Sequence, residues 1–153
     1  MDLDAYDILF ICSAFLFQIV LIIHFALRKW KFDIAVRYGP LVYALGIPAA
    51  IVSLLLILAG KPWSFWLSGF LYPLWGIYGY VVEYVRRIQW RNPARWSVLI
   101  PYLCLYLATI LFYWFPLALL YKPLWYMYGV LFLASTALNL TSHKTSKGQS
   151  LKP

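Results

Sequence analysis

Five long stretches without a single Asp, Glu, Lys or Arg dominate this 153-residue sequence. An α-helix rises 1.5 Å per residue, so about 20 residues cross a hydrocarbon core about 30 Å thick. Strands of a membrane barrel would instead alternate apolar and polar residues over about ten positions. The sequence therefore predicts an all-α polytopic membrane protein, with five transmembrane helices in a compact bundle. The predicted spans are residues 8–27, 38–60, 62–82, 96–121 and 123–143.

The composition supports this class of protein. Only 12% of the residues are charged and 64% are hydrophobic, whereas soluble domains carry about 25% charged residues. A soluble fold of this size would leave too much apolar surface in water. We expect one transmembrane domain, residues 1–143, followed by a short, basic, disordered tail, residues 144–153.

The basic residues predict the orientation of the chain. Threading through five spans places 11 of the 13 Lys and Arg residues on one side, together with the C-terminus. Basic loops mark the cytoplasmic side of membrane proteins, so we expect the N-terminus outside and the C-terminus inside, in a bacterial or archaeal cytoplasmic membrane. The net charge of +8 then indicates contact with anionic lipid rather than nucleic acid. The expected lipid-headgroup residues are Arg28, Lys29, Lys31, Arg37, Arg86, Arg87, Arg91 and Arg95.

A Lys-Pro dipeptide separates two pairs of spans, at Lys61-Pro62 and at Lys122-Pro123. Proline suits the first position of a helix, and lysine can extend its ammonium group from the interface into water. Both dipeptides therefore predict the tips of short outer hairpins. The pattern of basic loop, helix, Lys-Pro and helix occurs twice, which fits either an internal repeat or convergence on the same topology.

The span 62–82 carries the most regular pattern of small residues. Gly69 and Gly76 are seven residues apart, with Pro73 between them. Small residues allow neighbouring membrane helices to approach closely. We expect Gly69, Gly76 and Pro73 to be helix-packing positions, with Pro73 kinking its helix and Pro48 bending the preceding one.

Polar residues at the inner ends of the spans form the candidate binding site. Glu83 has Arg86 and Arg87 at i+3 and i+4, the spacing of ion pairs within a helix. Local neutralisation is one interpretation of Glu83, and binding of a cation, a proton or a polar headgroup is the other. The threading places six residues at a similar depth, which makes them candidate ligand-binding residues: Glu83, His24, Asn139, Ser135, Tyr43 and Tyr102.

Known catalytic and metal-binding motifs are absent from the sequence. We therefore assign no catalytic residue, no metal ligand and no cofactor. Length, five spans and abundant tryptophan are similar to the profile of the translocator (tryptophan-rich sensory) proteins. Their proline-rich first-loop motif has no counterpart here, so the similarity assigns no residue a role.

Three classes of function remain open. The first is a non-enzymatic accessory or scaffold subunit, which would bind other membrane protein chains or further copies of itself. The second is a small transporter, or a bundle that binds a hydrophobic or cationic ligand at the inner leaflet around Glu83. The third is a lipid-modifying membrane enzyme, which few convergent polar groups support.

Overall fold

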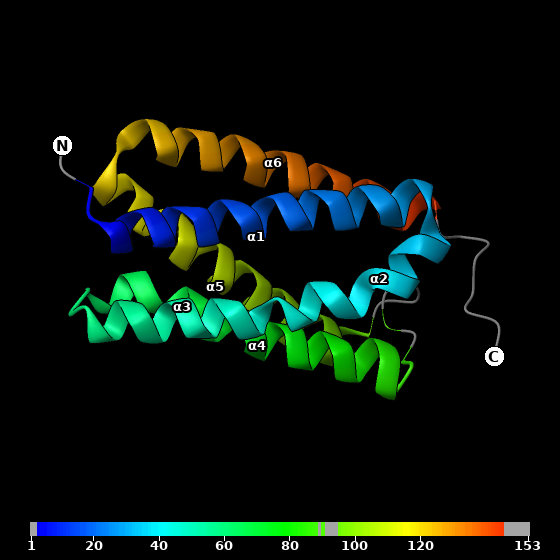
Figure 1. The fold of residues 1–153 in the computed structure, drawn as a ribbon. Helices are drawn as coiled ribbons and strands as arrows, with labels where there is room; N and C mark the ends of the chain where they lie inside the picture. Colours follow the sequence, from blue (N-terminus) through cyan, green and yellow to red (C-terminus); the bar gives the residue numbers. More distant parts are fainter. Residues whose placement is uncertain (1–2, 89, 91–94, 146–153) are drawn as a thin grey trace.

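The computed structural model describes residues 3–88, 90 and 95–145 of the chain. These residues form six α-helices and one π-helical turn, without a strand (Figure 1). In chain order the helices are α1 (Ala5–Trp30), α2 (Phe32–Ala44), α3 (Gly46–Leu58), α4 (Trp63–Tyr80), the π-helical turn η1 (Val81–Val85), α5 (Trp96–Leu120) and α6 (Lys122–Thr145). The predicted all-α class is thus confirmed for the described residues.

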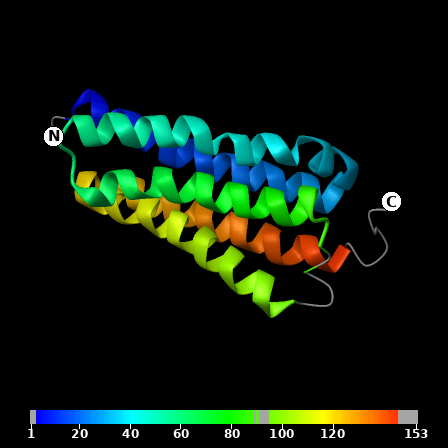
Figure 2. The same cartoon turned by 90° about the horizontal axis from the view of Figure 1, so that it is seen from below.

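The helices lie side by side and run back and forth along one long axis (Figures 1 and 2). The start of α1, the α3–α4 connection and the α5–α6 connection lie at one end, which we call the Lys61 end. The α1–α2 turn, η1 and the end of α6 lie at the opposite end, which we call the Glu83 end. The two Lys-Pro dipeptides therefore lie at the same end of the bundle, as the threading predicts.

Four segments are long and apolar enough to cross a membrane: Ala5–Trp30, Phe32–Leu58, Trp96–Leu120 and Lys122–Ser142. This finding indicates a membrane protein. The predicted span 62–82, which corresponds to α4 and the start of η1, is not among the four. Its Trp, Tyr, glycine and serine residues lower its mean hydropathy. Helix α4 nevertheless belongs to the bundle, because it packs against α2, α3 and α5.

The helices extend beyond several predicted limits. Helix α1 begins at Ala5 rather than at residue 8, because Asp4 caps it, and α2 begins at Phe32 rather than at residue 38. Helix α6 continues to Thr145, so the first two residues of the predicted tail are helical. The remainder of that tail lies outside the described residues. Charged residues can occupy helix ends, so uncharged runs underestimate helix length.

Two prolines shape the segment from α2 to α3. Pro48 has no N–H to donate to the carbonyl of Ala44, and α2 ends at Ala44 with a one-residue break at Leu45. The break lies three residues before Pro48, the residue at which the sequence predicts a bend. Pro40 likewise leaves the Val36 carbonyl without its helical donor, and the Tyr84 hydroxyl donates a hydrogen bond to it over 3.0 Å. Helix α4, in contrast, continues through Pro73.

Aromatic rings fill the centre of the bundle. Trp75 of α4 is 1% exposed, and its ring centroid lies 5.3 Å from that of Tyr43, 5.6 Å from that of Tyr102 and 5.8 Å from that of Tyr106. These rings come from α2 and α5, which both pack against α4. Tilted and edge-on pairs of this kind stabilise a core beyond their buried area.

Glycines bring the backbones of α2–α3 and α4 into direct contact. A Cβ atom on Gly46 would lie 2.7 Å from Pro73 Cα, and one on Gly76 would lie 3.0 Å from the Tyr43 carbonyl oxygen. A Cβ on Gly69 would overlap the Ala49 carbonyl and the Ser53 hydroxyl of α3. We call these contacts of Gly46, Gly69 and Gly76 the glycine seam.

The seam predicts that Gly69→Ala destabilises the bundle, because the new methyl group meets backbone atoms that cannot rotate away. Overpacking of this kind costs about 1–3 kcal/mol. The measurement is unfolding of the purified protein in mixed micelles by titration with a denaturing detergent. Ser97→Thr, which adds a methyl at an exposed position of α5, is the control. Equal stability of both variants would contradict the close approach of α3 and α4.

Candidate functional site

The Glu83 end holds a polar cluster built from three segments. Glu83 lies in η1 with its side chain 14% exposed. Arg28 of α1 places Nη1 3.5 Å from Glu83 Oε1, and the Tyr43 hydroxyl of α2 donates a hydrogen bond over 3.0 Å to Glu83 Oε2. One carboxylate thus joins α1, α2 and η1. We call Arg28, Tyr43 and Glu83 the Glu83 cluster.

The π-helical turn presents Glu83 and Tyr84 to α2. Its bonds join residues five apart, as in the 2.7 Å bond from the Arg86 N–H to the Val81 carbonyl. A π turn inserts one extra residue into a helix, and such turns occur frequently at functional sites. Two consecutive side chains of the turn therefore contact α2. Glu83 accepts a hydrogen bond from the Tyr43 hydroxyl, and the Tyr84 hydroxyl donates one to the Val36 carbonyl.

His24 belongs to the same end of the bundle. It is buried on α1 and packs beside Phe25, with ring centroids 5.6 Å apart. A Cβ atom on Gly39 of α2 would lie 3.7 Å from His24 Cε1 and still closer to the Tyr84 hydroxyl. Gly39 is therefore the point where α1, α2 and η1 meet, and it brings His24 close to the residue that follows Glu83.

Three of the six candidate ligand-binding residues therefore lie close together at the Glu83 end: His24, Tyr43 and Glu83. Ser135 instead accepts a 2.6 Å hydrogen bond from Gln18 Nε2, between α6 and α1. Tyr102 packs against Trp90, with ring centroids 4.8 Å apart, and against Trp75. Asn139 is half-buried on α6, and no contact among the described residues brings it to Glu83.

Arg28 is the member of the cluster that the sequence did not predict as a partner of Glu83. Helical spacing pointed to Arg86 and Arg87, but the helical turns end at Val85 and Arg87 adopts φ = 48°. The i+3 and i+4 rule has no basis beyond the end of a helix. The available signal was the position of Arg28 and Glu83 at the same ends of two predicted spans.

Other predicted headgroup residues lie at the same end. Lys29 and Lys31 flank the α1–α2 turn, Arg37 lies on α2, Arg86 and Arg87 follow η1, and Arg95 precedes α5. Two of these cations lie over a neighbouring ring, Lys29 over Trp30 at 5.2 Å and Arg37 over Tyr38 at 5.8 Å. Arg91 lies outside the described residues.

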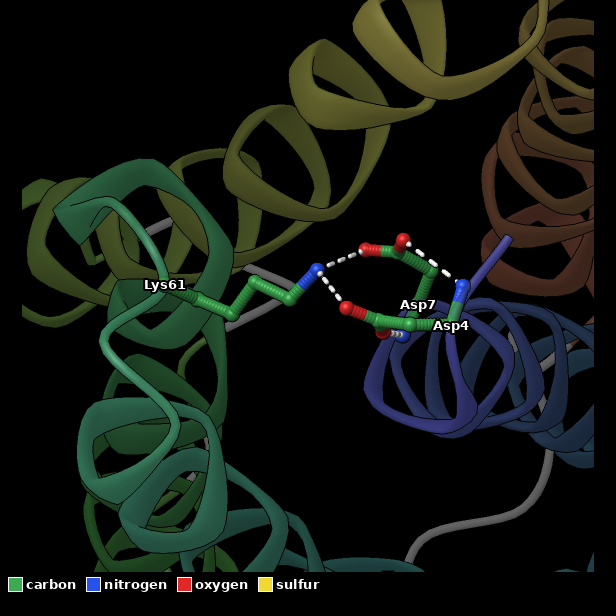
Figure 3. Close-up of polar contacts among 3 residues, drawn as sticks. All are labelled: Asp4, Asp7 and Lys61. Carbon is green, nitrogen blue, oxygen red and sulfur yellow. Dashed lines mark hydrogen bonds and ion pairs between the residues drawn. The ribbon is translucent and has the colours of Figure 1, made fainter. Parts of the chain in front are cut away.

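A second polar cluster closes the Lys61 end (Figure 3). Lys61 Nζ lies 2.8 Å from Asp4 Oδ2 and 2.5 Å from Asp7 Oδ1. Asp4 and Asp7 also form a capping box, in which each side chain accepts a hydrogen bond from the backbone N–H of the other. The ion pairs join the start of α1 to the α3–α4 connection. We call these three residues the outer clamp, after the outer hairpin that the sequence predicts at Lys61.

The clamp favours the charged forms of its groups. The hydrogen bond from Lys61, together with the backbone N–H of Asp7, lowers the pKa of Asp4 below its usual value of 3.8. Burial by itself would lower the pKa of Lys61, but the hydrogen bonds to Asp4 and Asp7 outweigh it and raise that pKa above 10.5. The sequence does not reveal this pairing, because Lys61 lies 57 residues after Asp4.

The remaining chemistry in the described part of the chain is sparse. No three His, Cys, Asp or Glu side chains there are grouped so that they could hold a metal ion. Cys12 and Cys104 are free and exposed. In the middle of the bundle, Gln18 bonds to α6 and Ser13 pairs with Tyr113 over 3.1 Å, so polar side chains mainly connect helices.

Comparison with protein-family models, curated proteins and solved structures finds no match to this chain.

The outer clamp predicts that Lys61→Met lowers the thermal midpoint of the protein in detergent by an amount that depends on pH. The lowered pKa of Asp4 means that its contribution is present above 3.8 and is lost as the pH falls through the folded-state value. The raised pKa of Lys61 means that its contribution is present below 10.5 and is lost above it. The difference between wild type and variant should therefore be constant from roughly pH 5 to 9 and shrink toward pH 3.

Lys122→Met is the matched control for this experiment, because Lys122 is an exposed lysine beside the other Lys-Pro connection. It should leave the midpoint unchanged across the same range. A Lys61→Met difference that stayed constant down to pH 3 would contradict the ion pair with Asp4.

The Glu83 cluster predicts energetic coupling between α1 and η1. Arg28→Gln and Glu83→Gln should each destabilise the protein, and the double variant should lose less than the two single losses combined. Directly interacting residues show coupling of about 0.5–3 kcal/mol. Unfolding titrations of the four proteins measure it. The same cycle with Arg95→Gln in place of Arg28→Gln should be additive. Additive effects of Arg28→Gln and Glu83→Gln would show that Arg28 and Glu83 do not interact.

Proposed function

We infer that this protein is a small, non-enzymatic, multi-pass membrane protein that acts as an accessory or scaffold subunit of a membrane assembly. The proposed arrangement has five spans, with α4 and η1 as the third. The N-terminus lies outside, and the C-terminus lies on the cytoplasmic face of a bacterial or archaeal membrane. The basic residues of the Glu83 end support this orientation, because basic segments favour the cytoplasmic side.

The observation that carries the proposal is the outward face of α6. Only 11% of an apolar 18-residue stretch of α6 is buried within the chain, against 33–39% of the corresponding stretches of the other three candidate spans. Val130, Ala134, Ala137 and Thr141 are all exposed on it, and their spacing of four, three and four residues aligns them along one side of the helix. Ala134, Ala137 and Thr141 are small, and small residues in such a row allow another membrane helix to approach closely.

The use of polar side chains supports the same function. The outer clamp, the Glu83 cluster and the Gln18–Ser135 hydrogen bond each connect one helix to another. Polar side chains that connect helices stabilise the arrangement of the bundle. Such a use suits a subunit that presents a fixed surface better than one that carries out a reaction.

Binding of a ligand at the Glu83 cluster is the second candidate function. The π-helical turn favours it, because such turns are frequent at functional sites, and it places Glu83 beside Arg28 and Tyr43. A transporter of this kind would lose binding or flux on Glu83→Gln while retaining its fold. A lipid-modifying enzyme has the least support, and lipid mass spectra of cells expressing wild type or His24→Ala would reveal such an activity.

The test of the proposed function is native mass spectrometry of the protein extracted gently from its own membrane. We expect the chain with other membrane protein chains, or with further copies of itself, at fixed stoichiometry. Ala137→Phe on the exposed face of α6 should abolish this association. Ala44→Phe, at an exposed position of α2, should preserve it. A monomer that carries a bound small molecule would refute the scaffold function and favour the Glu83 site.

A further inference from the structure

A long apolar recess follows α1 on the side that faces α2 and α3. One part, of about 180 Å³, is lined by residues from Leu9 to Val20 of α1, by Leu45, by α3 residues from Pro48 to Val52, and by Tyr72. A second part, of about 170 Å³, is lined by Val20, Ile23, His24 and Leu27 of α1 and by residues from Ala35 to Leu45. Val20 and Leu45 line both parts, so the two parts lie next to each other along α1. We call them together the α1 groove.

The break at Leu45 explains why the groove exists. Helix α1 packs more extensively against α2 than against α3, and the chain changes from one helix to the other at Leu45. Toward the Lys61 end, the outer clamp restores contact through a long lysine side chain (Figure 3). Between these two connections, Pro48 and Ala49 are too small to fill the space, and both line it.

The dimensions of the groove suit one acyl chain. The acyl chain of one leaflet extends about 15 Å, half of a 30 Å hydrocarbon core. At 1.5 Å per residue, this length matches α1 from Phe17 to Leu27, which line the groove toward the Glu83 end. A transmembrane helix, about 10–12 Å across, is much thicker than an acyl chain. Two recesses of about 180 and 170 Å³ therefore suit a slender apolar chain better than a helix.

The charges at the Glu83 end of the groove select the headgroup. Tyr38 lines this end, and the guanidinium of Arg37 lies 5.8 Å from the centre of its ring. Arg37 and Lys31 are exposed beside the same α1–α2 turn. Arginine and lysine are the side chains that bind phosphate, and each basic residue near a membrane surface strengthens binding of anionic lipid about fivefold.

We propose that the α1 groove is a specific binding site for an anionic phospholipid. One acyl chain lies between α1 and α2–α3, and the phosphate contacts Arg37 at the Glu83 end. This inference rests on the membrane location proposed above, but it does not depend on partner chains. The lipid would occupy the face of the bundle that α2 and α3 share with α1, away from the exposed face of α6.

Competition between two lipids tests the proposal. The purified full chain is equilibrated with equimolar phosphatidylglycerol and phosphatidylcholine, and native mass spectrometry counts the lipids that remain bound. Wild type should retain one phosphatidylglycerol with at least about fivefold preference. Arg37→Gln should remove about fivefold of that preference. Arg95→Gln is the matched control, because Arg95 is exposed at the same end but precedes α5, and it should retain the preference.

A second pair of variants tests the groove itself. Leu45→Trp fills the point where the two parts of the groove join, and it should abolish retention of phosphatidylglycerol. Leu54→Trp places the same side chain at an exposed position of α3 that does not line the groove, and it should retain the lipid. If Leu45→Trp does not fold, Leu41→Trp replaces it, because Leu41 lines the groove and is 61% exposed.

Two results would overturn the proposal. Equal retention of both lipids by wild type would indicate non-specific annular lipid. Retention of phosphatidylglycerol by the groove-filled variants would place the lipid elsewhere. Co-purifying protein chains that are lost on Ala137→Phe, but not on Leu45→Trp, would separate the fate of this site from that of the proposed function.

Discussion

The direct approach of two backbones is the contact on which the rest of this bundle depends. Helix–helix association in a membrane gains little from the hydrophobic effect, so close packing must supply the stability. The glycine seam provides that packing, because Gly46, Gly69 and Gly76 each replace a side chain with backbone contact between α2–α3 and α4. This approach also sets the distance at which Tyr43 reaches both Trp75 and Glu83.

Prolines and tyrosines have complementary roles in the same region. A carbonyl that loses its helical donor in an apolar setting costs free energy unless another donor replaces it. The Tyr84 hydroxyl donates a hydrogen bond to the Val36 carbonyl, which Pro40 leaves without its helical donor. The Tyr72 hydroxyl donates one over 2.6 Å to the Val42 carbonyl, close to the break at Leu45. Irregular helices are therefore accommodated through side chains of α4 and η1, which lock the bend into one geometry.

The sequence predicts the helical segments of the chain more accurately than the contacts between their side chains. Uncharged runs identified the helical segments, and Pro48 identified the break in the second one, because both effects act locally. Helix ends were less accurate, since the capping box at Asp4 extends α1 beyond the uncharged run. Shared depth placed His24, Tyr43 and Glu83 together, but it also included Ser135, which pairs with Gln18. Depth gives no information about the direction in which a side chain points. The pairing of Arg28 with Glu83 depends on the π-helical turn, which the pattern of apolar residues does not reveal.

The outer clamp also has a consequence for the order in which the protein is assembled. Asp4 and Lys61 are separated by 57 residues in the chain. The first helix therefore leaves the ribosome long before the lysine that will secure it, and its acidic start has no counter-charge from Lys61 during that interval. Closure of the clamp requires that α2 and α3 have been synthesised, because Lys61 follows both helices in the chain. This contact can therefore form only once the first three helices are complete.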